Sequence, residues 1–337
     1  MSDPTPLAPL VRSFFENHLA CQRSVSPNTV RSYRDGLKLF LRFAAARLGK
    51  PVTRLLVADL QEPLVLAFLA DLERERGNAI QTRNHRLGAI RVLCEYIAGR
   101  EPALVDHCRR VATIPRKRGA AVPEIRYLEK DEVTAILGAA DRRTAAGRRD
   151  HALLQFLYNT GARVQEAADA RVGWLHLSAP LRVELLGKGR KWRTCPLWES
   201  TAQCLRELLA ARPRAAGRDD HLFLNRGGGP LSRSGIADIV GRAVARAAGS
   251  MASLSGRRVT PHTFRHTTAM HLLQSGVEIN VIRSWLGHVS LVTTNRYVEI
   301  DLAMKAKALE TCAVGGTGTQ PGRWRTDPDL LTWLESL

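Results

Sequence analysis

Residues 181–197, LRVELLGKGRKWRTCPL, alternate apolar and polar side chains on both sides of a short turn sequence. Leu181, Val183 and Leu185 occupy every second position, Gly187-Lys188-Gly189-Arg190 has the chemistry of a hairpin turn, and residues 192–197 resume the extended pattern. Most of the remaining chain follows helical spacing. The sequence therefore predicts a mainly α-helical protein with a small antiparallel β-sheet.

The spacing of apolar and basic residues before residue 109 predicts a bundle of helices with several basic faces. Ser26-Pro27 is a helix start with proline at the first helical position, and apolar residues then recur at helical spacing from Val30 to Ala44. Further helices are expected through residues 63–69 and about 82–98. We predict an N-terminal helical domain over residues 1–108 and a basic, proline-containing linker over residues 109–126.

A second domain is predicted over residues 127–312, followed by a flexible tail over residues 313–337. An acidic first turn at residues 128–133 leads into a helix, and helical spacing breaks at Gly161 and resumes from Arg163. Thr260-Pro261 is another helix start. It places His262 and Arg265 in a first turn, where free backbone N–H groups favour an anion such as phosphate.

The charge balance of the 337 residues favours a polyanionic partner. Lysine and arginine number 50 against 32 aspartate and glutamate, a net charge of +18. No long apolar run and no secretory leader are found, so we expect a soluble, cytoplasmic protein. The six cysteines form no CxxC pair, which favours reduced thiols, mostly as small buried apolar groups.

Rows of basic residues at helical spacing allow two interpretations. The helix after Ser26 displays cations opposite its apolar face, which is typical either of a solvated surface or of a face that follows DNA phosphates. This feature alone does not choose between them. The residues that we predict to contact DNA are Arg31, Arg34, Lys38, Arg83, Arg116, Lys117, Arg118, Lys191 and Arg193.

The pair His262 and His266 has the spacing of two zinc ligands on one helical face. A zinc hydrolase of this pattern needs glutamate directly after the first histidine, and Thr263 stands there instead. We therefore predict no metal site and no cofactor.

A second constellation points to phosphodiester chemistry. Each of its members has an ordinary structural explanation when taken alone. Together, two arginines, a hairpin lysine, two histidines and a tyrosine are the groups needed to transfer a phosphodiester through a covalent phosphotyrosine. These candidate catalytic residues are Arg163, Lys188, His262, Arg265, His288 and Tyr297.

The order of these motifs resembles the tyrosine recombinases of the phage integrase family, including the XerC and XerD type. Thr-Gly-x-Arg-x-x-Glu at residue 160, the hairpin lysine, His-x-x-Arg at 262, Leu-Gly-His at 286 and the final tyrosine occur in sequence. The resemblance implies a SAM-like core-binding domain and a catalytic domain that together form a C-shaped DNA clamp. It also implies a supporting role for Glu166, behind the catalytic residues.

The same resemblance implies a function and an assembly. We expect a site-specific recombinase that cleaves and rejoins double-stranded DNA through a 3′-phosphotyrosine and a Holliday junction, as a homo-tetramer on two sites or a hetero-tetramer with related recombinases. Integration, excision or transposition of a mobile element is the expected task. XerC/XerD-type resolution of chromosome or plasmid dimers, a catalytically silent DNA-binding protein of the same fold, and a topoisomerase using phosphotyrosine chemistry are the alternatives.

Overall fold

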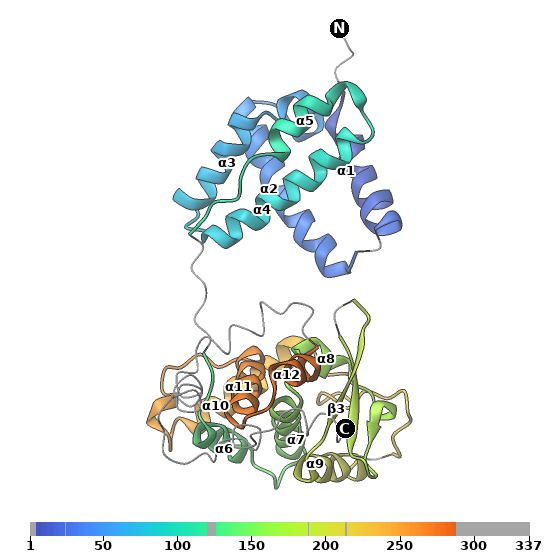
Figure 1. The fold of residues 1–337 in the computed structure, drawn as a ribbon, viewed down its shortest axis with the longest axis vertical. Coiled ribbons are helices and arrows are strands. Elements are labelled where there is room, and N and C mark those ends of the chain that lie inside the picture. Colours follow the sequence, from blue (N-terminus) through green and yellow to red (C-terminus); the bar gives the residue numbers. More distant parts are fainter. Residues whose placement is uncertain (1–4, 24, 120–125, 188, 213, 288–337) are drawn as a thin grey trace, which may run out of the picture. The chain divides into compact units, whose positions relative to one another are not determined.

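The computed structural model describes residues 5–23, 25–119, 126–187, 189–212 and 214–287. The chain divides into two compact units, residues 1–123 and 124–337, each with its own apolar core (Figure 1). None of the helices in these described ranges is both long and apolar enough to cross a membrane.

The first unit is a bundle of helices around α4. Figure 1 shows α4 next to α2, α3 and α5, and contacts between α4 and each of the three agree with that view. Phe40, Phe68, Leu93 and Ile97 are buried in its core. The elements are α1 (Leu7–Ser13), the π-helical η1 (Phe14–Gln22), α2 (Pro27–Leu48), η2 (Val52–Arg54), η3 (Val57–Asp59), α3 (Glu62–Arg74), α4 (Ile80–Ala98), η4 (Pro102–Leu104) and α5 (Val105–Ala112).

The predicted start of α2 is confirmed. The Ser26 hydroxyl accepts a hydrogen bond from the backbone N–H of Thr29, and Pro27 is the first residue of the helix. The first unit extends beyond residue 108, into the segment expected to be linker. Helix α5 continues to Ala112, and Val111 and Ile114 are buried in the first core. Val111 and Ile114 lie between the two groups of cations in this segment, and their burial keeps it in the unit.

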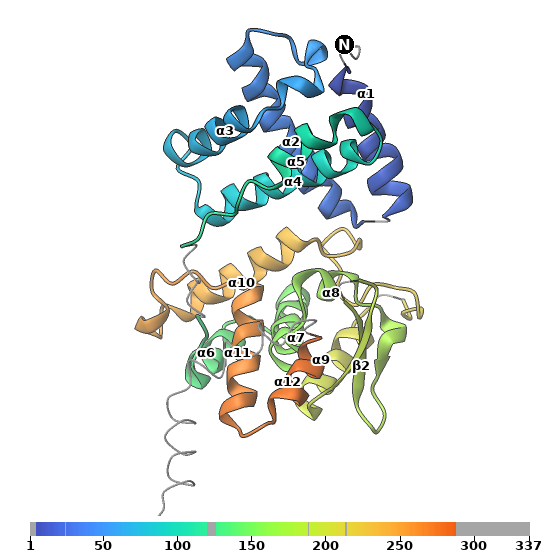
Figure 2. The same cartoon turned by 45° about the horizontal axis from the view of Figure 1, so that its top comes forward.

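The second unit is built around α7. This helix contacts α6, α9 and α11, and Figure 2 shows it at the centre of the unit. Leu153, Phe156, Leu157 and Phe223 are fully buried in the surrounding core. The helices are α6 (Lys130–Gly138), α7 (Ala145–Thr160), α8 (Val164–Asp169), η5 (Val172–Trp174), α9 (Glu199–Ala210), α10 (Arg233–Ala247), η6 (Ala252–Leu254), α11 (Pro261–Gln274) and α12 (Ile279–Leu286).

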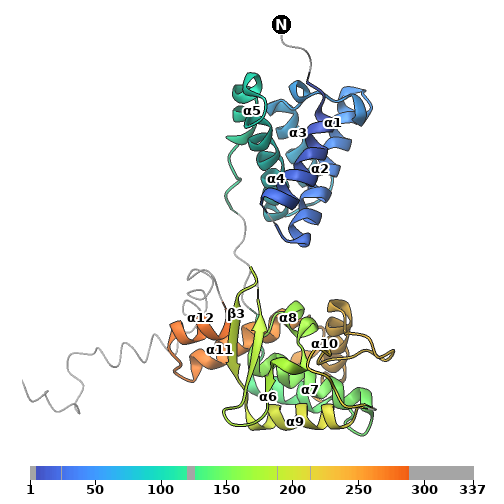
Figure 3. The same ribbon diagram turned by 90° about the vertical axis from the view of Figure 1, so that its right-hand side faces the viewer.

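The predicted antiparallel sheet is confirmed and gains a third, very short strand. Strands β1 (Leu175–His176), β2 (Arg182–Leu186) and β3 (Trp192–Pro196) are hydrogen-bonded in that order. Val183, which pairs with Cys195, and Leu185, which pairs with Arg193, point toward the core. Figure 3 shows β3 beside α12, and contacts between these two elements agree with that view.

Candidate active site

Arg163 stands where the chain turns from α7 into α8. Gly161 ends α7 in the left-handed conformation, with φ of 56°, and Arg163 is the N-cap residue of α8. Its Nη1 donates to Glu166 Oε1 at 2.6 Å, and its Nη2 donates to the carbonyl of Gly287 at 3.1 Å. The side chain is 31% exposed, so a rigidly held guanidinium reaches solvent.

Glu166 is a buried carboxylate between two arginines. Its side chain is 3% exposed, and besides the Arg163 guanidinium it accepts from the Arg163 backbone N–H at 2.9 Å and from Arg193 Nη2 at 2.7 Å. Burial by itself raises the pKa of Glu166. The charge of Arg193 and the hydrogen bonds and charge of Arg163 outweigh burial, and the pKa lies below its ordinary value. Glu166 is therefore ionised and holds both guanidiniums.

Arg265 comes from α11 and is 2% exposed. The predicted start of this helix is confirmed, since the Thr260 hydroxyl accepts from the backbone N–H of Thr263 and Pro261 opens the helix. Arg265 Nη1 donates to the carbonyl of Gly161 at 2.7 Å, and Nη2 donates to the carbonyl of Leu286 at 2.5 Å. Arg265 thus joins the end of α7 to the end of α12.

The C-terminus of α12 gathers three arginines from three different elements. Its last carbonyls and that of the following glycine accept from one guanidinium each: Trp285 from Arg193 at 2.7 Å, Leu286 from Arg265, and Gly287 from Arg163. Carbonyls at a helix C-terminus lack partners within the helix and carry partial negative charge. Together with Glu166, they offset the repulsion between three cations, and this explains how the cations share one place.

Glycine is required at the end of α12. Gly287 has a φ of 62°, and a Cβ there would lie 2.7 Å from Arg193 Cδ. Both the backbone conformation and the close approach of the arginine exclude a larger residue without strain.

His262 lies one turn before Arg265 on α11 and is exposed. Partial burial, and then the positive charges of Arg265 and Arg163, lower the pKa of His262 below its ordinary value. Its ring lies edge-on to that of His266, with 4.2 Å between centroids. A histidine in this state is neutral near pH 7 and can accept a proton.

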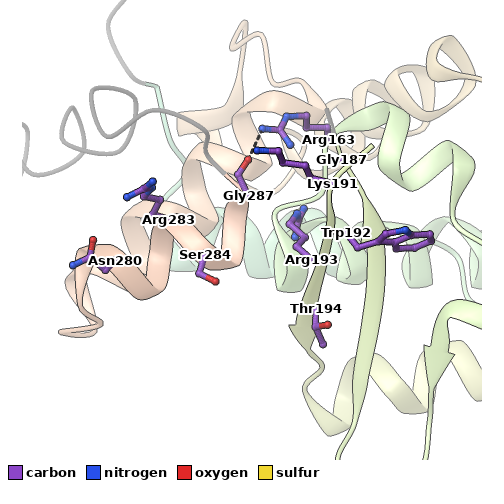
Figure 4. A pocket seen from close by; sticks show the side chains of 10 residues that line it. All are labelled: Arg163, Gly187, Lys191, Trp192, Arg193, Thr194, Asn280, Arg283, Ser284 and Gly287. Atoms are coloured by element: carbon purple, nitrogen blue, oxygen red, sulfur yellow. Dashed lines mark hydrogen bonds between the residues drawn. The ribbon is translucent and has the colours of Figure 1, made fainter. Parts of the chain in front are cut away.

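A cavity of about 710 Å³ opens beside Arg163, between the hairpin and α12. In Figure 4 the side chains of Arg163 and Lys191 extend toward Gly287, whereas the Trp192 indole points away from them, across β3. Arg283 also lines this cavity, and sequence reasoning missed it. Arg283 precedes Gly287 by four residues, one helical turn, and that spacing was the available signal.

The predicted site residues fall into three groups. Arg163, His262, Arg265 and Glu166 come together as described above. Lys188, His288 and Tyr297 lie outside the described residues. The candidate DNA contacts differ in exposure. Arg83 and Arg193 have side chains that are 10% and 7% exposed. The others have exposed positions: Arg31, Arg34, Lys38, Arg116, Lys117, Arg118 and Lys191.

Burial of Arg83 and Arg193 has a physical reason in each case. Arg83 lies 3.8 Å from Glu73 and donates to Asn84, whereas Arg193 bonds Glu166 and the carbonyl of Trp285. Burying a guanidinium costs free energy unless a carboxylate or carbonyl group accompanies it. Both guanidiniums have such partners within the fold, and their contact with DNA stays a prediction.

Family models match most of the chain. The Phage integrase family matches residues 126–303, and the Phage integrase, N-terminal SAM-like domain matches residues 13–101. Among curated relatives, y4rC of Sinorhizobium fredii, named as an integrase/recombinase, is 40% identical over 338 residues, which cover all of both chains. The tyrosine recombinase XerC of Pelobacter propionicus is 31% identical over 297 residues, 88% of this chain and 92% of that protein.

Solved structures show the same fold. XerH site-specific recombinase bound to a palindromic difH substrate aligns with a TM-score of 0.67 at 20% identity, covering 87% of this chain and 81% of that one. The Tn1549 transposon integrase in complex with a circular intermediate DNA aligns with a TM-score of 0.66 at 16% identity, covering 92% and 100%. With the family models and the full-length relative, these findings give one conclusion: the chain belongs to the phage integrase family of tyrosine recombinases.

Proposed function

We propose that this protein is a site-specific DNA recombinase that cleaves one strand at a time with Tyr297 and rejoins it to a different strand. The observation that carries the proposal is the arginine cluster at the end of α12, where Arg163 is exposed to a cavity and Arg265 is fixed next to it. The names of the relatives and the net charge of +18 support DNA as the substrate.

Arg163 is suited to bind the phosphate that is cleaved. Within the described part of the chain its guanidinium forms two hydrogen bonds, to Glu166 and Gly287. A guanidinium has five N–H groups, so other N–H groups can donate to phosphate oxygens. Because the guanidinium is held before DNA arrives, it does not have to reorganise as negative charge builds up in the transition state. Arg265 adds a second fixed positive charge.

The remaining roles follow from the family pattern and the chemistry of each group. The phenol oxygen of Tyr297 attacks the phosphorus as His262 accepts its proton, and the bond from phosphorus to the 5′-oxygen breaks. Lys188 protonates that leaving oxygen, and His288 donates a hydrogen bond to the phosphate. The products are a 3′-phosphotyrosine and a free 5′-hydroxyl. One phosphodiester replaces another, so the reverse reaction can join a new strand.

A mobile-element role fits the relatives better than chromosome resolution. The integrase/recombinase y4rC matches over the whole chain at 40% identity, whereas the XerC relative matches 88% of the chain at 31%. We propose action on two DNA sites by a tetramer, with the first unit contacting DNA through Arg31, Arg34 and Lys38 and the following segment through Arg116, Lys117 and Arg118.

The test is a covalent complex. The full-length protein is incubated with DNA from the flanks of its own gene. This DNA carries nicks near the candidate sites, so that the short fragment released by cleavage diffuses away and the strand is not rejoined. The products are then separated under denaturing conditions. We expect a protein–DNA adduct that maps to one phosphate. Tyr297→Phe should abolish the adduct and leave DNA affinity within about twofold, because only the nucleophilic oxygen is removed. An adduct formed by Tyr297→Phe would overturn the assignment.

A further inference from the structure

Arg193 lies on the inner face of β3, although its charge predicts a surface position. Residues alternate across the sheet, so Arg193 and Cys195 point toward the core while Trp192 and Thr194 are exposed. The Arg193 side chain is 7% exposed and lies beside α12, where Figure 4 shows it below Lys191.

Three elements meet at the Arg193 guanidinium. Nη2 donates to Glu166 Oε2 at 2.7 Å, and Nη1 donates to the carbonyl of Trp285 at 2.7 Å and lies 2.6 Å from the Sγ of Cys195. The other oxygen of Glu166 binds Arg163. The carboxylate of Glu166 thus binds two guanidiniums, one on each oxygen. One belongs to Arg163, and the other belongs to Arg193 of the hairpin.

The position of Arg193 along the chain links these contacts to the hairpin loop. Residues 187–191, which include Lys188, join β2 to β3, and the N–H of Gly187 donates to the carbonyl of Lys191 at 2.8 Å to close the loop. Arg193 is the second residue of the strand that follows. It therefore fixes the end of the hairpin against α12 and against the carboxylate that orients Arg163.

We propose that Arg193 is a positioning residue that couples the docking of the β2–β3 hairpin to the orientation of Arg163, through Glu166. The inference rests on the proposed function and concerns a residue that does not itself touch the phosphate. Without the Arg193 guanidinium, Glu166 Oε2 keeps only the backbone N–H of Arg163 as a partner. The carboxylate is then less constrained, and so is the Arg163 guanidinium that Oε1 holds. Displacement of a catalytic group by about 1 Å can cost about 100-fold in rate.

Loss of Arg193 also changes the acid sensitivity of the site. The groups that face Glu166 are Arg163 from the start of α8 and Arg193 and Cys195 from β3, with Arg265 on the next carbonyl of α12. The charge of Arg193 is the largest of the effects that lower the pKa of Glu166. With a neutral residue in its place the pKa rises, so Glu166 takes up a proton at a higher pH and releases Arg163 there.

The experiment compares Arg193→Met, Arg193→Lys and the parent protein, each full-length. The rate of covalent-adduct formation is measured in a single turnover at saturating nicked DNA from pH 5 to 9, together with DNA affinity and thermal unfolding. We expect Arg193→Met to react about 100-fold more slowly, with DNA affinity within about twofold. Its pH profile should show a loss of rate in acid from protonation of Glu166, in addition to the loss that His262 causes. Arg193→Lys should recover part of the rate, because it restores the charge without the fork.

Arg182→Met is the matched control, the same substitution on β2 of the same sheet. Arg182 donates to the carbonyl of Pro180 at 3.4 Å and, within the described part of the chain, forms no hydrogen bond or ion pair with Glu166 or α12. Its adduct rate and pH profile should equal those of the parent.

A double-mutant cycle with Glu166→Gln tests the route of coupling. If Arg193 acts through Glu166, Arg193→Met should cost less than about threefold in the Glu166→Gln background, far less than in the parent. Equal losses in both backgrounds, an unshifted pH profile, or a loss of DNA affinity with a normal saturated rate would overturn the proposal. If the parent protein forms no adduct, both the proposed function and this role of Arg193 fail. If the parent forms an adduct that Tyr297→Phe does not form, the proposed function stands, and the result for Arg193→Met tests only the role of Arg193.

Discussion

Glu166 holds Arg163 at both ends of that residue: Oε1 accepts from the guanidinium at 2.6 Å, and Oε2 accepts from the backbone N–H at 2.9 Å. The second bond also satisfies a free N–H group at the start of α8. The orientation of the side chain and the start of the helix therefore depend on one buried carboxylate.

Glu166→Gln should lower both stability and cleavage. The amide cannot neutralise the guanidiniums of Arg163 and Arg193, and its NH2 group faces another donor. We expect the free energy of unfolding to fall by roughly 3 kcal/mol, as for the loss of one partner of a buried ion pair. Urea denaturation measures the loss, and adduct formation measures the effect on rate. Glu199→Gln is the control, because it is the same substitution at an exposed glutamate that pairs with Arg206 at 2.7 Å; an equal effect there would contradict the prediction.

Gly287→Ala should be more damaging than an alanine at another left-handed glycine. Gly276 has a φ of 81° and no atom within 4 Å of the position that a Cβ would take, whereas a Cβ at Gly287 meets Arg193. Gly276→Ala should cost only the backbone strain, about 1 kcal/mol. Gly287→Ala should exceed this and also slow adduct formation. Thermal unfolding of both variants is the measurement, and similar losses would show that the arginine moves aside freely.

The pH dependence of cleavage should report His262. A neutral imidazole is required to accept the phenol proton, and burial and the charges of Arg265 and Arg163 lower the pKa of His262. The rate should therefore persist below the ordinary histidine pKa of about 6.5 and decline only as the pH falls through the lowered value. His262→Gln should react slowly and should not show this decline at low pH. His221→Gln, which replaces a ring bonded to the Ala168 carbonyl, should still show the decline. If His262→Gln still showed the decline, another group would be responsible for the pH dependence.

Glu132 should contribute more stability than an exposed glutamate. Its side chain is 4% exposed and accepts from Arg257 at 2.7 and 2.8 Å and from the Ser253 hydroxyl at 2.7 Å. Burial raises its pKa, but these hydrogen bonds, that of the Glu129 N–H and the charge of Arg257 outweigh burial and lower it. Its contribution is therefore present above the ordinary pKa and is lost as the pH falls through the lowered one.

Glu132→Gln should cost roughly 3 kcal/mol at pH 7 and less in acid. Glu207→Gln is the control, since Glu207 forms an exposed pair with Arg142 at 3.6 Å and should cost less than about 0.5 kcal/mol. Urea denaturation at pH 7 and pH 4 checks both values. A loss at Glu132 that stays constant between these pH values would argue against the ion pair as its cause.

Local chemistry made the framework predictable. Ser26-Pro27 and Thr260-Pro261 carry their own start signals, and the alternation in residues 181–197 predicts the two main strands within a residue of their observed ends. The convergence of Arg163 and Arg265 was expected from the order of the family motifs. Their shared partner, the end of α12, was not, because carbonyl acceptors have no signature in a sequence.

Unexpected burial occurs where a partner distant in the sequence stabilises a buried charge. Arg83 and Arg193 look like surface cations by composition, yet Glu73 and Glu166 make their burial possible. The alternation of β3 did contain a signal for Arg193, since it lies two residues from the buried Cys195. The positive charge of Arg193 nevertheless predicts an exposed side chain. Its burial is explained only by the position of Glu166 in the folded chain, which supplies the opposite charge.

The three arginine bonds at the end of α12 also restrict movement of that helix. Arg163, Arg193 and Arg265 come from the start of α8, from β3 and from α11, so a displacement of α12 along its axis would strain bonds to three separate elements at once. A substitution that shifts α12 is therefore expected to disturb all three elements together.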